Sequence, residues 1–138
     1  MQAITPVLTI GTKQMTEQER KIKGILLNPV TRTIKEIEVD RGHKAIQRAL
    51  GCSIITNAME FENGDYAFCD DEGLFNSHDF TIIRGAYQPF AGSVLVLGKE
   101  NDDGETQDVQ TGLAWFKANV SFMTQLQVEA LYSRAVGL

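Results

Sequence analysis

The sequence lacks the features that identify several large classes of protein. Its 138 residues contain no apolar stretch near the roughly 20 residues that a membrane-spanning helix needs. Its two cysteines, Cys52 and Cys69, are too few for a disulfide framework, and we expect both to stay reduced. At the amino terminus the charged residues follow the apolar ones, which is the reverse of a secretory signal. We therefore expect a cytoplasmic protein with no membrane partner.

The motifs of common enzymes and cofactor sites are also missing. The sequence has no G-x-x-x-x-G-K-[ST], G-x-G-x-x-G, H-E-x-x-H or C-x-x-C, so it indicates no phosphate loop, dinucleotide loop, zinc protease site or redox pair. His43 and His78 are the only histidines, and neither belongs to a nucleophile motif. An enzyme would need one of them close to Cys69, Ser77 or the acidic turn at 70–72. We therefore expect no catalytic residues, no metal and no cofactor.

Positive charge is sparse and scattered. The formal net charge is −5, and the densest basic group is Arg20, Lys21 and Lys23. Binding to nucleic-acid phosphates needs clustered Lys and Arg, so the sequence argues against a nucleic-acid partner. The acidic segments 70–72 and 99–108 have no calcium-loop spacing and are interpreted as solvated turns. The acidic excess leaves open a protein that mimics nucleic acid.

Length and composition indicate one compact domain. Of the residues, 43% are hydrophobic and 22% are charged, which is typical of a globular protein. We expect residues 1–21 to be an N-terminal extension and residues 22–138 to form a single domain. Within that domain we expect a sheet-rich core at 22–98, an acidic loop at 99–110 and a helical region at 111–138.

The first part of the domain has the pattern of a hairpin followed by a helix. Residues 22–28 and 33–39 have strand-like composition and are separated by a proline-containing turn. Asp40 can cap a helix over 41–50, where the apolar residues recur at helical spacing. Gly51 stands where a left-handed residue would end that helix.

An Asn-Gly pair at 63–64, between two strand-like runs, predicts a second hairpin. A loop of only these two residues would place Tyr66 and Phe68 together on the core face of the hairpin. Ala67 and Cys69 would then lie on the opposite face, which we expect to be partly solvated.

The rest of the chain completes an α+β pattern. Residues 80–83 read as a strand, and residues 94–97 read as a strand buried on both faces. From 111 to 135 the apolar spacing is helical, as one helix or two, with Thr124 and Gln127 as a capping box. We expect an antiparallel or mixed sheet of five to six short strands, one short helix and a helical C-terminal region.

Candidate binding residues gather in the segment that joins two of these strands. Arg84, Tyr87 and Phe90 combine an arginine with aromatics, the mixture that is enriched at interface hot spots. Asn76 and Asp79 are their polar neighbours. The alternative is a loop whose Tyr and Phe only cover the core.

Several segments between residues 22 and 98 follow a common pattern. They are IKGILLNPVTRTIKEIEV, the LGC after the short helix, DYAFCDDEGLF, Asn76, Gly85 and SVLVLG. Together they resemble a family of small proteins and domains of unknown function encoded by bacteriophages and some bacterial mobile elements. These are strand and turn residues, so the resemblance implies a shared fold and an origin of that kind, in a bacterial host cell. It carries no activity over to this chain.

Small size and missing motifs favour a non-enzymatic accessory protein that binds and modulates a host protein. Three alternatives stay open: sequestration of a small molecule or nucleotide-type ligand, an acidic nucleic-acid mimic, and an enzyme. Residues 111–138 are also a candidate for pairing two copies into a homo-oligomer. Trp115 and Phe116 could anchor that region to the sheet or to the second copy.

Overall fold

The computed structural model describes residues 21–135, and its side chains to residue 133. The predicted extension at 1–21 lies outside the described residues except for Lys21. The strands are β1 (Ile22–Asn28), β2 (Thr33–Val39), β3 (Ile55–Glu60), β4 (Tyr66–Asp70), β5 (Asp79–Ile83), β6 (Phe90–Ala91), β7 (Val94–Leu97) and β8 (Val120–Thr124). The helices are α2 (His43–Leu50), α3 (Gly73–Asn76), α4 (Leu113–Asn119) and α5 (Gln125–Ala135). None of these helices is long and apolar enough to cross a membrane.

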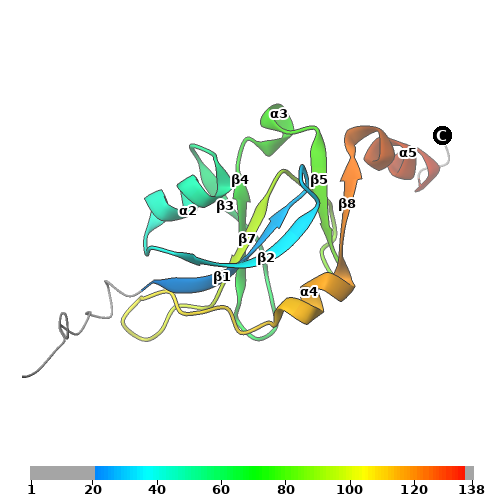
Figure 1. Cartoon of the computed structure of the whole chain (residues 1–138). Helices are drawn as coiled ribbons and strands as arrows, with labels where there is room; N and C mark the ends of the chain where they lie inside the picture. The colour runs from blue at the N-terminus through cyan, green and yellow to red at the C-terminus, as the bar shows by residue number, and fades with distance from the viewer. Residues whose placement is uncertain (1–20, 136–138) are drawn as a thin grey trace, which may run out of the picture.

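The strands form two antiparallel sheets (Figure 1). One has five strands in the order β2-β1-β7-β4-β3, and the other has three in the order β6-β5-β8. The predicted α+β class is confirmed, although eight strands in two sheets replace the five or six expected in one.

The core has two main parts, one on each face of the five-stranded sheet, and a smaller third cluster of Phe80, Ala91 and Val128 beside α5. Central strand β7 is at most 1% exposed at each residue, so the prediction of a strand buried on both faces is confirmed. Leu95 and Leu97 pack with Ile46 of α2 on one face. Val94 and Val96 belong to the other part, which the second sheet and α4 complete. The five-stranded sheet therefore separates the molecule into an α2 side and a second-sheet side.

The first hairpin and its helix largely follow the sequence prediction. β1 and β2 pair from Ile22 with Val39 to Asn28 with Thr33. Gly51 ends α2 in the left-handed region at φ 68°, as predicted. The predicted cap at Asp40 is wrong, because α2 begins two residues later than expected, after Gly42, with no side-chain cap.

The second hairpin differs from its predicted register. A bulge shifts the β3–β4 pairing between Asn57 and Met59. The loop is also longer than two residues, because the Phe61 N–H donates to the Asp65 carbonyl oxygen at 2.8 Å. Gly64 has a φ of 96° but the preceding asparagine has a negative φ, whereas the tight turn that Asn-Gly favours needs both to be positive.

The two faces of β4 are the reverse of those predicted. Ala67 and Cys69 are only 0% and 8% exposed, whereas Tyr66 and Phe68 are half-buried. The small side chains face the second sheet, where the layers approach closely. The aromatic side chains lie on the α2 side, and α2 is too short to cover them.

The C-terminal region contains a strand that the sequence pattern did not predict. β8 separates α4 from α5 and pairs with β5, from Asp79 with Thr124 to Ile83 with Val120. β5 is the central strand of its sheet, and β8 pairs with the backbone groups on the side that β6 leaves open, which overrides the helical spacing. The capping box is confirmed: the Thr124 N–H donates to Gln127 Oε1 at 2.8 Å, and the Gln127 N–H to Thr124 Oγ1 at 3.3 Å.

α4 is anchored to the body by aromatic contacts. Phe116 is fully buried and lies edge-on to Phe61, with ring centroids 5.9 Å apart. Trp115 contacts both rings but stays 36% exposed. The aromatic pair thus anchors this region to the sheet, one of its two predicted roles.

The acidic loop is tied back to the sheet. The Gly98 N–H donates to the Gln107 carbonyl oxygen at 2.9 Å, and Glu100 forms a bridge with Thr106. A Cβ at Gly98 would overlap the Asp108 carbonyl oxygen and lie 2.7 Å from that of Gln107. Only glycine allows this close approach of two backbone segments.

The substitution Gly98→Ala should lower the free energy of unfolding by about 2–3 kcal/mol, because backbone oxygens cannot move aside as flexible side chains do. Chemical denaturation checks this. Gly112→Ala is the matched control, since nothing lies within 4 Å of its Cβ position and its φ is −76°. The control should cost less than about 1 kcal/mol, as expected for an N-cap glycine. Equal losses in the two variants would contradict the close approach at Gly98.

Candidate functional site

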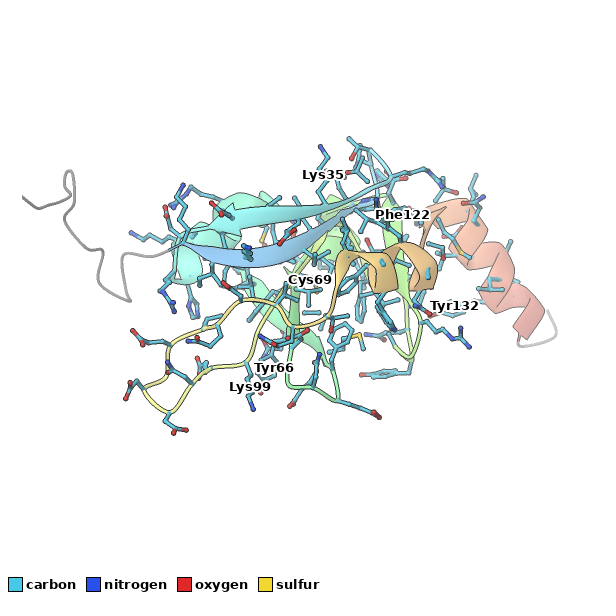
Figure 2. The ribbon with its side chains drawn as sticks, turned by 60° about the horizontal axis from the view of Figure 1, so that its bottom comes forward. Lys35, Tyr66, Cys69, Lys99, Phe122 and Tyr132 are labelled. Carbon is cyan, nitrogen blue, oxygen red and sulfur yellow. The ribbon has the colours of Figure 1, made fainter. Side chains whose placement is uncertain are left out.

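A groove of about 330 Å³ lies between α3, β6 and α5. Leu74 of α3 forms one wall, and Val128 and Tyr132 of α5 form another. Phe90 lines it from β6, and Cys69 lines it from β4. Figure 2 shows Cys69 within the body and Tyr132 on the outlying helix α5. We call this site the α3–α5 groove.

The segments around this groove carry most of the exposed large apolar side chains. In the part of the chain with described side chains there are nine, and six lie on α3, on the turn before β6 or on α5. The six are Leu74, Phe75, Tyr87, Leu126, Leu131 and Tyr132. Of the six, Leu74 and Tyr132 line the groove itself. Contiguous apolar exposure marks interaction surfaces, whereas scattered single residues do not.

α3 is held at the edge of the groove by two features of its sequence. A Cβ at Gly73 would overlap the Ala91 carbonyl oxygen, so glycine permits α3 to pack against β6. The Asp70 carboxylate accepts hydrogen bonds from the Glu72 N–H at 2.8 Å and from Asn76 Nδ2 at 3.0 Å. Because α3 is held in this way, its next two side chains, Leu74 and Phe75, are largely exposed to solvent.

α5 is attached to the body by little buried surface. Val128 is 5% exposed and packs with Phe80 and Ala91. The other described side chains of α5 are exposed. Figure 1 shows the helix at one end of the molecule, beyond β8. An isolated helix of its 11 residues would be marginal in water, so its capping box and this one anchor position it.

Three of the five predicted binding residues lie at or beside this groove. Phe90 is buried and lines it. Asn76 bonds to Asp70, which also lines it. Tyr87 is 92% exposed and adjoins the lining residues Gln88 and Pro89.

The other two predicted residues lie at opposite ends of β5. Asp79 starts the strand, and its carbonyl oxygen accepts the Ser77 hydroxyl at 2.9 Å. Arg84 follows the strand end, and its N–H donates to the Asn119 carbonyl oxygen at 2.9 Å. Arg84 does not line the groove, although Phe80 of that strand and Gln88 of the turn that follows do.

Sequence reasoning missed the walls that α3 and α5 supply. The helical spacing over 111–135 predicts a helix, but it does not bring Val128 and Tyr132 to the same groove as Leu74. The available signal was two adjacent large apolar residues, Leu74 and Phe75, directly after an acidic turn. Adjacent positions on a single-turn helix cannot both face the core.

The histidines and cysteines lie in different places. His43 is on the α2 side of the five-stranded sheet, and Cys69 is on the second-sheet side. His78 Nδ1 lies 3.2 Å from Gln125 Oε1. Among residues 21–133, no three His, Cys, Asp or Glu side chains are placed to hold a metal ion.

The surroundings of Cys69, at the floor of the groove, keep its thiol protonated and therefore unreactive. Burial, followed by the nearby carboxylates of Asp70 and Asp71, raises the pKa of Cys69 to about 11. Burial and then Asp70 also raise the pKa of Cys52, which is less buried. A thiol is nucleophilic only as thiolate, so the Cys69 thiol is a packing group at neutral pH.

Iodoacetamide at pH 8 should alkylate Cys52 well before Cys69, because a pKa of about 11 leaves about one Cys69 thiol in a thousand ionised. Peptide mapping by mass spectrometry gives both rates. Since the folded-state pKa is raised, the stability that Cys69 contributes is present below pH 9 and is lost as the pH rises towards 11. The variant Cys52→Ser isolates the Cys69 rate. If Cys69 were alkylated as fast as in urea-unfolded protein, its burial and its raised pKa would both be contradicted.

Comparison with known proteins gives one family. No curated protein matches the chain, and no solved structure matches it. A family model described as a domain of unknown function (DUF3846) matches residues 22–120, from β1 to the first residue of β8. The match extends past the predicted resemblance at 22–98 to include the acidic loop and α4, and α5 lies outside it. Because the match covers more than half of its residues, the chain belongs to the DUF3846 family of domains of unknown function.

Proposed function

We propose that this chain is a non-enzymatic accessory protein that binds another protein through the α3–α5 groove. The observation that carries the proposal is the set of large apolar side chains exposed around the groove, with Phe75 and Tyr87 89% and 92% exposed. Protein interfaces use such aromatic residues as anchors, placed around a partly preformed apolar depression.

The energetics support a docking role for these residues. Covering one such side chain removes apolar surface from water and contributes about 1.5–3 kcal/mol. A partner that covers Leu74, Phe75 and Tyr87 together would gain several kcal/mol towards binding before the cost of association. α3 is fixed by Gly73 and Asp70, so little ordering entropy opposes docking on that wall.

The proposal extends to the origin of the protein and the kind of partner. We propose that it comes from a bacteriophage or mobile element and that the partner is a protein of the bacterial host cytoplasm, whose activity it modulates. The support is the resemblance across residues 22–98, together with the small size of the chain. A second copy of the chain, docked through residues 111–138, is the competing occupant.

Photo-crosslinking in the bacterial cells that carry the gene tests the proposal. The amino acid p-benzoylphenylalanine replaces Phe75 in one variant and Tyr87 in another. Both variants should cross-link to the same host polypeptide. The control carries the probe at Val30, which is 71% exposed but lies on the β1–β2 turn, and it should give no such product. The proposed surface would be overturned if the host polypeptide cross-linked equally from all three probe positions. It would also be overturned if neither Phe75 nor Tyr87 gave a cross-linked product.

Substitution of the same side chains should weaken the interaction with the cross-linked protein. We expect Phe75→Ser and Tyr87→Ser each to raise the Kd at least about tenfold, since each removes an exposed aromatic side chain that the partner would cover. Isothermal titration calorimetry with the purified pair measures this, with Val30→Ser as the control. A cross-link from the groove to this chain itself would instead identify a homo-oligomer, which light scattering would confirm, and would contradict the host-protein partner.

A further inference from the structure

The charge around the α3–α5 groove is of one sign. Among the described residues, its charged lining residues are Asp70 and Asp71, and no lysine or arginine lines it. Glu72, the next residue in the chain, adds a third carboxylate at the start of α3. On the opposite wall, the described side chains of α5 include Glu129 and no cation. The apolar groove therefore has an acidic border.

Two of these carboxylates are free to meet a partner. Asp70 is not, because it accepts hydrogen bonds from the Glu72 N–H and from Asn76. Asp71 and Glu72 are exposed, and within the described part of the chain neither side chain forms a hydrogen bond or an ion pair. Burial and then the carboxylates of Asp70 and Asp71 raise the pKa of Cys69, so their negative potential reaches the floor of the groove.

The free carboxylates lie beside the apolar side chains that a partner would cover. Asp71 and Glu72 directly precede Gly73, and Leu74 and Phe75 follow it, 78% and 89% exposed. A partner that covers these two side chains must also approach both carboxylates and remove part of their water. Removing water from a carboxylate is unfavourable unless a cation or a hydrogen-bond donor replaces it. A partner surface that is apolar alone would therefore bind weakly at this border.

We propose that the docking segment of the partner is basic as well as apolar, with lysine or arginine side chains that pair with Asp71 and Glu72. This inference rests on the proposed function, because it names the chemistry of the protein that binds in the α3–α5 groove. Lysine and arginine donate to the exposed carboxylates, while large apolar side chains of the same segment contact Leu74 and Tyr132. Opposite charge on the two surfaces also speeds their encounter.

The same carboxylates disfavour the competing occupants. In a symmetric dimer the same surface patch lies on both subunits, so the carboxylates of one copy would face those of the other. The net charge of −5 on each copy adds to this repulsion. The phosphates of a nucleic acid would be repelled by the acidic border for the same reason. The charge therefore favours a basic protein segment over a second copy of the chain.

A second groove supplies the control surface for this inference. It has a volume of about 590 Å³ and lies beside α2, with Tyr66 and Phe68 on its floor. Its lining includes Glu100 of the acidic loop and Arg41, whose Nη1 donates to the Thr106 carbonyl oxygen. Figure 1 shows the acidic loop at the opposite end of the molecule from α3 and α5. Substitutions on this loop therefore change the net charge without altering the α3–α5 groove.

Selection of random peptides of about 16 residues, displayed on phage, against the full chain tests the inference. The informative peptides are those that bind at least about tenfold more weakly to the variant Phe75→Ser. We expect these peptides to be enriched in lysine and arginine, next to large apolar residues, relative to the unselected library. Their Kd should rise severalfold between about 50 and 500 mM NaCl, because salt screens exposed charge pairs.

A matched pair of double variants locates the effect. Asp71→Asn with Glu72→Gln should raise the Kd of these peptides by about three- to thirtyfold, which is the effect of losing two exposed ion pairs. Glu100→Gln with Asp102→Asn removes the same charge from the acidic loop and should change the Kd by less than about twofold. Fluorescence anisotropy with labelled peptides measures both values.

The outcomes separate this inference from the proposed function. If no selected peptide depended on Phe75, the α3–α5 groove would not be a docking surface, and both would be overturned. If Phe75-dependent peptides were not enriched in lysine and arginine, or if the two double variants lost affinity equally, the basic segment alone would be overturned. Self-association of the chain that depends on Phe75, measured by light scattering, would also overturn it.

Discussion

The buried carboxylate of Asp65 is the interaction on which the rest of the structure depends. Asp65 is fully buried, and it accepts hydrogen bonds from the Gln110 N–H at 3.0 Å, the Thr111 N–H at 2.8 Å and the Thr111 hydroxyl at 2.6 Å. A buried charge without such donors would be strongly destabilising, so the β3–β4 loop and the segment entering α4 must meet here. This junction lies after the acidic loop and before α4, β8 and α5. It therefore positions the acidic loop, which bounds the groove beside α2, and, through α4, the helix that walls the α3–α5 groove.

Both grooves arise where a short element covers a sheet only in part. α2 has 8 residues and leaves Tyr66 and Phe68 half-buried beside it. α5 has 11 residues, but Val128 is its buried anchor, so the groove beside it stays accessible. Strand β7, buried on both faces, keeps the two sites apart. Exposed aromatic side chains stand beside the α3–α5 groove, whereas the groove beside α2 has the half-buried rings of Tyr66 and Phe68 on its floor.

The sequence was a good guide where the controlling interaction is local. The β1–β2 hairpin, the left-handed Gly51 and the capping box of Thr124 with Gln127 each depend on residues within a few positions of one another. It was a poor guide where a distant segment decides. β8 was read as helix because its partner β5 is about 40 residues away in the chain. For the candidate site, Phe90 and Asn76 could be expected, whereas the walls from α3 and α5 could not.

By itself, the sequence determined the α+β class, the central strand 94–97, the β1–β2 hairpin, the C-terminal end of α2 at Gly51 and the capping box of α5, because these follow from hydrophobic period, glycine conformation and side-chain capping. Only the tertiary structure decided which face of β4 is buried in the core. Alternation puts Tyr66 and Phe68 on one face and Ala67 and Cys69 on the other, but it cannot say which face the second sheet will cover. That sheet packs closely on the small side chains and leaves the rings half-exposed. The same choice moved the aromatic residues from the deep core to the floor of a groove, since burial depends on what lies opposite a strand as well as on its own residues.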